Sequence, residues 1–198
     1  MNPEIVQLAA EHGARSASLF WGWGVALEMF LGGTAGALMF FMGLKRFAPE
    51  MDRILHRVVL GCLLLAGALL FLDLGAKQHV YRFLMSWRPE SVIFWGTWFF
   101  VLSLIATVLR WRLPGAVLGP GLMLYPGLLL ASMAARPTWR GPWIPLEFLL
   151  LSLGSGAAVL MLVDPAIRNR SVWIRPTAFG LLAVILIARV AVLFAGQG

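Results

Sequence analysis

The chain contains few of the residues that build disulfides and metal centres. Its single cysteine, Cys62, stands in the middle of an apolar run and has no partner in the chain for a disulfide. An iron–sulfur cluster needs four ligands, so this chain cannot hold one by itself. We interpret Cys62 as a small buried apolar residue rather than as a reactive thiol.

Histidine is scarce at membrane depth. The three histidines, His12, His56 and His79, fall in predicted loops or at the ends of apolar runs. A membrane haem with two histidine ligands requires them at depth on facing helices. We therefore predict no haem and no metal in this chain. Metal-ligand spacings, a nucleophile elbow and a phosphate-binding loop are also absent from the sequence.

Charged residues are scarce as well, at 13% against about 25% in an average soluble domain. Hydrophobic residues make up 60%, and they gather in runs of the length that a bilayer core requires, about 20 residues per helix. We predict an all-α integral membrane protein, a single membrane domain over 1–198, with about six transmembrane helices. The expected spans are 19–43, 55–74, 91–109, 113–134, 143–163 and 173–194.

The net charge of +7 comes from basic residues in the short connections, where they set topology and contact lipid headgroups. We therefore expect the lipid bilayer, and no nucleic acid, as a partner. Nine Lys and Arg fall in the connections 44–57, 110–112 and 164–175, against six on the other side. This bias predicts that the 44–57 face is cytoplasmic and that both termini lie on the outer side of the membrane.

Spans one and five resemble each other. Aligning Glu28 with Glu147 places Gly33 on Ser152 and Ala37 on Gly156. We interpret this as a parallel repeat, with a four-helix bundle in 1–134 and two helices of an incomplete second bundle in 143–198. The alternative is that two helices rich in small residues look alike without being related.

Small residues line one face of each of these two spans, at Gly32, Gly36, Gly154 and Gly156. Such faces allow helices to approach closely, and we predict that they pack helices together. A cofactor tail lying in the same groove is the alternative.

Four ionisable residues fall within or at the ends of apolar runs. A charge inside hydrocarbon costs several kcal/mol, so each needs a partner or a wet cavity. Glu28 lies deepest, and it is either a proton relay, a headgroup partner, or a protonated side chain bonded to a neighbouring helix. Asp73 and Glu147 lie nearer the interface, and we expect the Arg189 side chain to extend to the membrane surface.

Several motifs follow one another in a specific order. They are Asp-Leu-Gly from Asp73, Phe-Trp-Gly-x-Trp from Phe94, Tyr-x-Gly-x-Leu-Leu from Tyr125, and Trp-Ile-Pro-Leu from Trp143. Together with the glycines of span one, this order resembles the polysulfide reductase/NrfD family of membrane subunits. The resemblance covers about residues 20–162, and the chain is shorter than the eight helices usual in that family.

The resemblance implies a quinone-binding electron-transfer subunit and membrane anchor of a respiratory oxidoreductase. Its membrane would be the bacterial or archaeal inner membrane, with both termini on the periplasmic side. The quinone would be menaquinone or ubiquinone. The partners would be an iron–sulfur (ferredoxin-like) subunit and a catalytic oxidoreductase subunit, typically containing molybdenum or tungsten. The chain would not be catalytic alone.

The candidate quinone site combines residues expected near the outer face. Tyr125 and His79 would donate hydrogen bonds to the headgroup. Glu28 and Asp73 would take its protons, with Glu147 as a further proton-transfer residue. Trp21, Trp23 and Trp139 would enclose the ring, or serve only as interfacial belt residues.

Two other functions are compatible with the sequence. A small proton-coupled transporter would use Glu28 and Glu147 as coupling carboxylates. A purely structural anchor would leave the quinone to other subunits.

Overall fold

The computed structural model describes residues 23–73, 88–133, 139 and 141–195. In these ranges every regular element is a helix. Their order is α2 (Trp23–Leu44), α3 (Pro49–Asp73), α5 (Val92–Val108), α6 (Arg112–Ala131), α7 (Trp143–Val163), the short α8 (Pro165–Arg168) and α9 (Ile174–Ala195). Five are long and apolar enough to cross a membrane, and α5 is a shorter apolar helix. The prediction of an all-α integral membrane protein is confirmed.

Helix α3 begins earlier than its predicted span. It starts at Pro49, and Glu50 and Asp52 stand in its first turn, where proline and acidic side chains favour a helix start. Asp52 then accepts a hydrogen bond from Arg112 of α6 at 2.5 Å. Residues 49–54, which precede the predicted span, are therefore helical. Hydropathy alone does not distinguish such a polar helix start from a loop.

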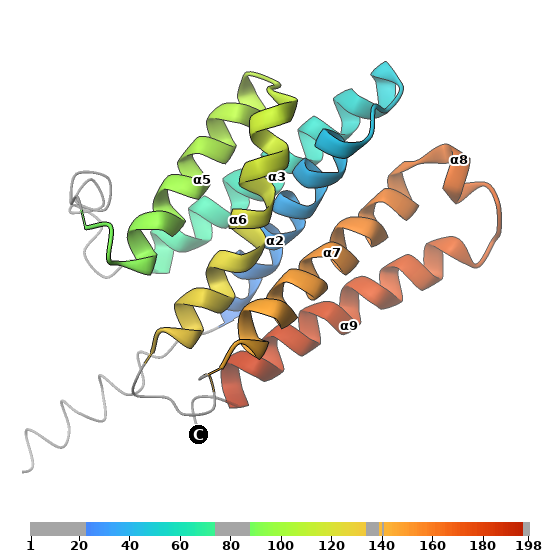
Figure 1. The fold of residues 1–198 in the computed structure, drawn as a ribbon. Helices are drawn as coiled ribbons and strands as arrows, with labels where there is room; N and C mark the ends of the chain where they lie inside the picture. Colours follow the sequence, from blue (N-terminus) through green and yellow to red (C-terminus); the bar gives the residue numbers. More distant parts are fainter. Residues whose placement is uncertain (1–22, 74–87, 134–138, 140, 196–198) are drawn as a thin grey trace, which may run out of the picture.

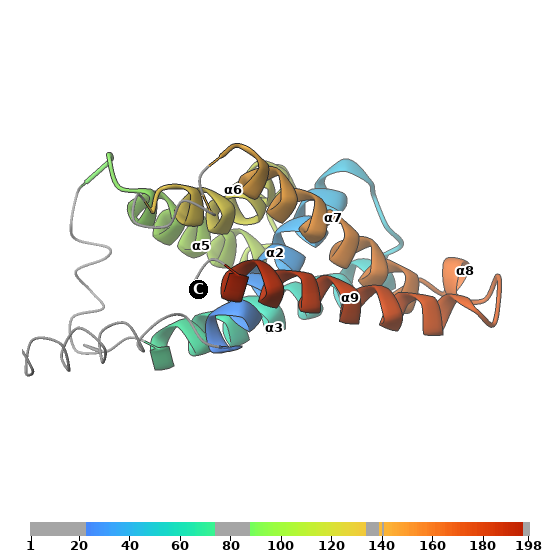
Figure 2. The same cartoon turned by 90° about the horizontal axis from the view of Figure 1, so that it is seen from below.

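Helix α2 lies at the centre of the molecule and packs against α3, α6, α7 and α9 (Figure 1). Successive long helices alternate in direction, so α2 and α7 run the same way and α9 returns beside them (Figures 1 and 2). The first residue of α2 and the last turn of α9 thus meet, with the rings of Trp23 and Phe194 5.8 Å apart. We call this side of the molecule the Trp23 end, and the opposite side the Lys45 end.

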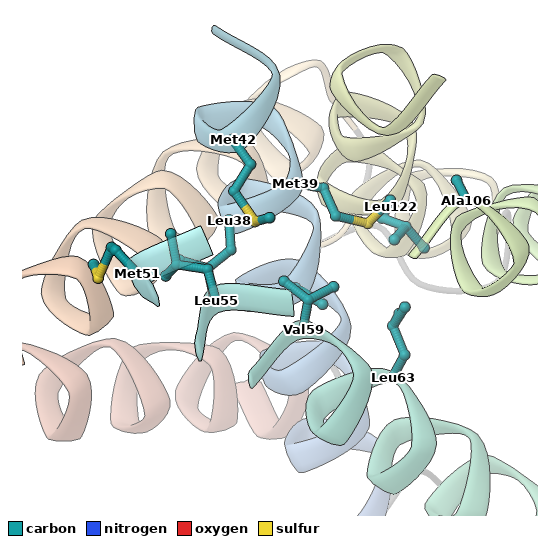
Figure 3. Close-up of a cluster of buried hydrophobic side chains, with 10 residues drawn as sticks. Leu38, Met39, Met42, Met51, Leu55, Val59, Leu63, Ala106 and Leu122 are labelled. Carbon is teal, nitrogen blue, oxygen red and sulfur yellow. The ribbon is translucent and has the colours of Figure 1, made fainter. Parts of the chain in front are cut away.

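The largest buried apolar cluster joins α2 to its neighbours (Figure 3). Leu38, Met39 and Met42 of α2 pack with residues from three other helices, namely Met51, Leu55, Val59, Leu63, Ala106 and Leu122. Lipid tails are as apolar as leucine, so close van der Waals contact, more than escape from water, holds such helices together. This packing fixes α3, α5 and α6 around α2.

Glycines set the distance between α2 and α6. A Cβ atom at Gly36 would lie 2.7 Å from the carbonyl oxygen of Gly119, and one at Gly119 would overlap the Gly36 carbonyl. By contrast, among the described residues no atom of another helix lies within 4 Å of a Cβ built at Gly32. Backbone-to-backbone contact therefore depends on Gly36 rather than on Gly32.

The contact between α2 and α7 pairs equivalent positions of the aligned spans. A Cβ at Gly33 would overlap Ser152 Oγ, and one at Gly156 would lie 2.6 Å from Ala37 Cβ. These are the pairs produced by aligning Glu28 with Glu147. Because α7 packs on both α2 and α6, the described helices form one packed unit. Their division into two bundles stays a prediction.

Candidate functional site

Five of the predicted site residues lie at the Trp23 end. Trp23, Glu28, Tyr125, Trp139 and Glu147 come from the first turns of α2 and α7, the second half of α6 and the segment after it. Trp21 and His79 lie outside the described residues. Asp73 is the last residue of α3, and its side chain also lies outside the described part.

Tyr125 sits against the glycine of the Phe-Trp-Gly-x-Trp motif. Its ring occupies the space where a Cβ at Gly96 of α5 would lie. The ring is thereby held between α5 and α6, which pack along one another. The motif thus has a physical meaning, since Gly96 is the residue that allows an aromatic ring to contact the α5 backbone.

Glu28 is half-buried on α2, and Tyr125 lies on α6, which packs against α2. The structure therefore brings together a phenol and a carboxylate, from two helices that pack closely. A phenol can donate a hydrogen bond, and a carboxylate can accept a proton. This pair is the chemical centre of the candidate site.

The two described tryptophans of the predicted ring enclosure differ in their surroundings. Trp23 is 68% exposed, with Phe194 as its aromatic neighbour. Trp139 is only 2% exposed and packs with Met29, Phe148 and Leu193. Its indole Nε1 donates to the carbonyl of Val192 at 3.0 Å. Trp139 therefore ties the segment between α6 and α7 to α9.

We expect Trp139→Phe to loosen α9. The substitution keeps an aromatic ring and removes the hydrogen bond to Val192, which is worth about 1 kcal/mol. Thermal unfolding of the detergent-solubilised protein should show this loss, and Trp143→Phe, at an exposed tryptophan nearby, should not. Equal melting temperatures for Trp139→Phe and wild type would contradict this role for Trp139.

The expectation that Arg189 extends to the membrane surface is wrong. Its side chain is fully buried. It donates to the carbonyl of Met29 at 2.8 Å and to Ser152 Oγ at 2.6 Å. The physical reason is that Gly33 of α2 leaves room for the guanidinium. Sequence reasoning could have found this from an arginine in the last span together with small residues in two others.

A second polar group lies at the Lys45 end, and sequence reasoning did not identify it. His56 Nδ1 lies 2.8 Å from the carbonyl oxygen of Asp52, whose carboxylate also binds Arg112. The adjoining pocket, lined by Thr107, Trp111 and others, has a volume of about 20 Å³. Such a volume holds a single water molecule, so this pocket does not admit an aromatic headgroup.

Comparison with known proteins agrees with the motif pattern. A family model described as polysulfide reductase matches residues 8–195. A curated relative, Protein NrfD of Escherichia coli (strain K12), is 28% identical over 78% of this chain. The chain spans 62% of that relative's length.

Proposed function

Since this chain belongs to the polysulfide reductase family of NrfD-type membrane subunits, we propose that it binds a quinone and anchors a respiratory redox complex. It exchanges electrons with a docked iron–sulfur subunit, which in turn serves a catalytic oxidoreductase subunit. The quinone is menaquinone or ubiquinone. The membrane-anchor role follows from the family and the apolar helices, whereas the quinone site rests on the residues at the Trp23 end.

The observation that supports this proposal is the placement of Tyr125 and Glu28. They stand on α6 and α2, two helices that pack closely, toward the end of the bundle where α2 and α7 begin. A quinone headgroup needs a donor for its carbonyl oxygens and a base for the protons that accompany its redox change. Tyr125 and Glu28 are of these two types, so the residues present fit the group.

Each residue then has a defined task. A bound quinone supplies a two-electron, two-proton couple. Tyr125 would donate a hydrogen bond to a headgroup oxygen, and Glu28 would accept a proton released when the quinol is oxidised. Asp73, which ends α3, accepts a proton nearer the aqueous side. His79 and Trp21 complete the proposed set, His79 as a second donor and Trp21 with Trp23 beside the ring. Electrons would pass between the quinone and the docked iron–sulfur subunit.

The test is quinol-linked turnover of the complete complex with Tyr125→Phe and Asp73→Asn. Loss of the Tyr125 hydrogen bond to the headgroup, or of the Asp73 carboxylate as proton acceptor, should lower kcat/KM about tenfold. Asp164→Asn is the matched control, because that carboxylate caps α8 at the Lys45 end. Its turnover should equal the wild type.

Unchanged turnover in both site variants would refute the quinone assignment. Analysis of lipids extracted from the purified complex then distinguishes a quinone-binding redox subunit from a purely structural anchor. A complex without quinone would identify the chain as a structural anchor only.

A further inference from the structure

Arg189 lies where three helices meet, at a depth where a charged group is costly. Helix α9 exposes most of its other side chains, whereas Arg189 points inward between α2 and α7 and is fully buried. A buried arginine in a membrane span costs several kcal/mol unless its charge is compensated. Its surroundings must therefore contain the compensating groups.

Neutral partners account for only part of that compensation. The guanidinium donates to the Met29 carbonyl, to Ser152 Oγ and, at 3.4 Å, to the Phe148 carbonyl. It also lies over the Phe148 ring, 4.9 Å from the ring centre. Its Nε is buried without a hydrogen-bond acceptor among the described residues. These groups orient the guanidinium and leave its net charge in place.

Two glutamates stand next to the residues that Arg189 contacts. Met29 directly follows Glu28, and Phe148 directly follows Glu147. The arginine thus binds the backbone one residue beyond each glutamate. The aligned spans place these two glutamates at equivalent positions. One guanidinium on α9 therefore lies between two similar helices, each of which carries one glutamate.

We propose that Arg189 is a positioning residue that keeps Glu28 ionised, which makes α9 part of the proton-accepting site. Attraction between opposite charges is strong where water is excluded, so the cation favours the carboxylate form of Glu28 over the neutral acid. The need for a proton acceptor rests on the proposed function. The pairing of charges does not, because it requires no bound quinone.

Infrared spectroscopy of the purified complex tests the pairing directly. Subtracting the spectrum of Glu28→Gln isolates the absorption of the Glu28 carboxyl group. In the wild type the Glu28 absorption should be that of a carboxylate. In Arg189→Gln it should become a protonated carboxyl band, which the double variant Glu28→Gln/Arg189→Gln lacks. A carboxylate that persists in Arg189→Gln would overturn the proposal.

Two control variants separate charge from hydrogen bonding. Arg189→Lys retains the positive charge and loses the planar fork, and Ser152→Ala removes a hydrogen-bond partner of the same guanidinium. Both should keep Glu28 as a carboxylate. A protonated Glu28 in Ser152→Ala would mean that local packing, not the cation, controls its charge, and it would contradict the proposal.

If Arg189→Gln assembles poorly, the yield of assembled complex tests the pairing of Arg189 with Glu28. A carboxylate left without its cation is destabilising, so adding Glu28→Gln should raise the yield about tenfold over the single variant. Equal yields would overturn the pairing. Quinol-linked turnover is measured separately: normal turnover of Glu28→Gln alone would refute its proton-accepting role, whereas the infrared result still decides the pairing.

Discussion

Replacing Gly36 with alanine is expected to destabilise the protein by about 1–3 kcal/mol, the usual cost of overfilling a packed contact. The added methyl group would lie 2.7 Å from the Gly119 carbonyl oxygen and 3.0 Å from Leu122 Cβ. The first of these atoms belongs to the backbone of α6, which cannot rotate away as a side chain can. Helices α2 and α6 would therefore have to separate along their whole contact.

Gly32→Ala is the matched control for this prediction. Gly32 lies one turn earlier on the same helix and is also buried, but a Cβ there meets no atom of another helix within 4 Å. Its stability should stay within about 0.5 kcal/mol of the wild type, since alanine also favours a helix. Thermal unfolding of both variants in detergent gives the comparison. Equal losses of stability in Gly36→Ala and Gly32→Ala would show that the close contact between α2 and α6 at Gly36 does not set the stability.

The sequence predicted the helices well because their signal is strong. A long apolar run has no other stable form in a bilayer than a helix, so the six spans could be placed from composition alone. Polar extensions of helices carry no such signal. The start of α3, which includes Asp52 and precedes the predicted span, was accordingly assigned to a connection.

The candidate site could be predicted only in part. Motif order selected Tyr125, and depth in the first span selected Glu28; the structure places the two residues on helices that pack together. The inward direction of Arg189 was not predictable from its own span. It depends on the space at Gly33 and on the oxygens of Met29 and Ser152, which come from helices distant in sequence. Hydropathy assigns a depth to each residue and gives no information on which neighbour it faces.

Gly96→Val is expected to lower quinol-linked turnover about a hundredfold. The valine side chain would occupy the position of the Tyr125 ring, so the ring must leave its place between α5 and α6. Its hydroxyl group would then lose its position relative to Glu28 and to the proposed headgroup. A displacement of about 1 Å in a positioning group can cost about a hundredfold in rate. This loss exceeds that expected for Tyr125→Phe, which keeps the ring in place.

Gly121→Val separates loss of the site from disturbance of the helix contact. Gly121 lies on α6 at the same α5–α6 contact, and a Cβ there would come within 2.5 Å of the Phe99 ring instead of Tyr125. Both variants therefore insert the same side chain against an aromatic ring between the same helices. If Tyr125 binds the headgroup, Gly121→Val should retain most of its turnover at a similar loss of thermal stability. Equal loss of turnover in the two variants would assign the effect to packing and remove Tyr125 from the site.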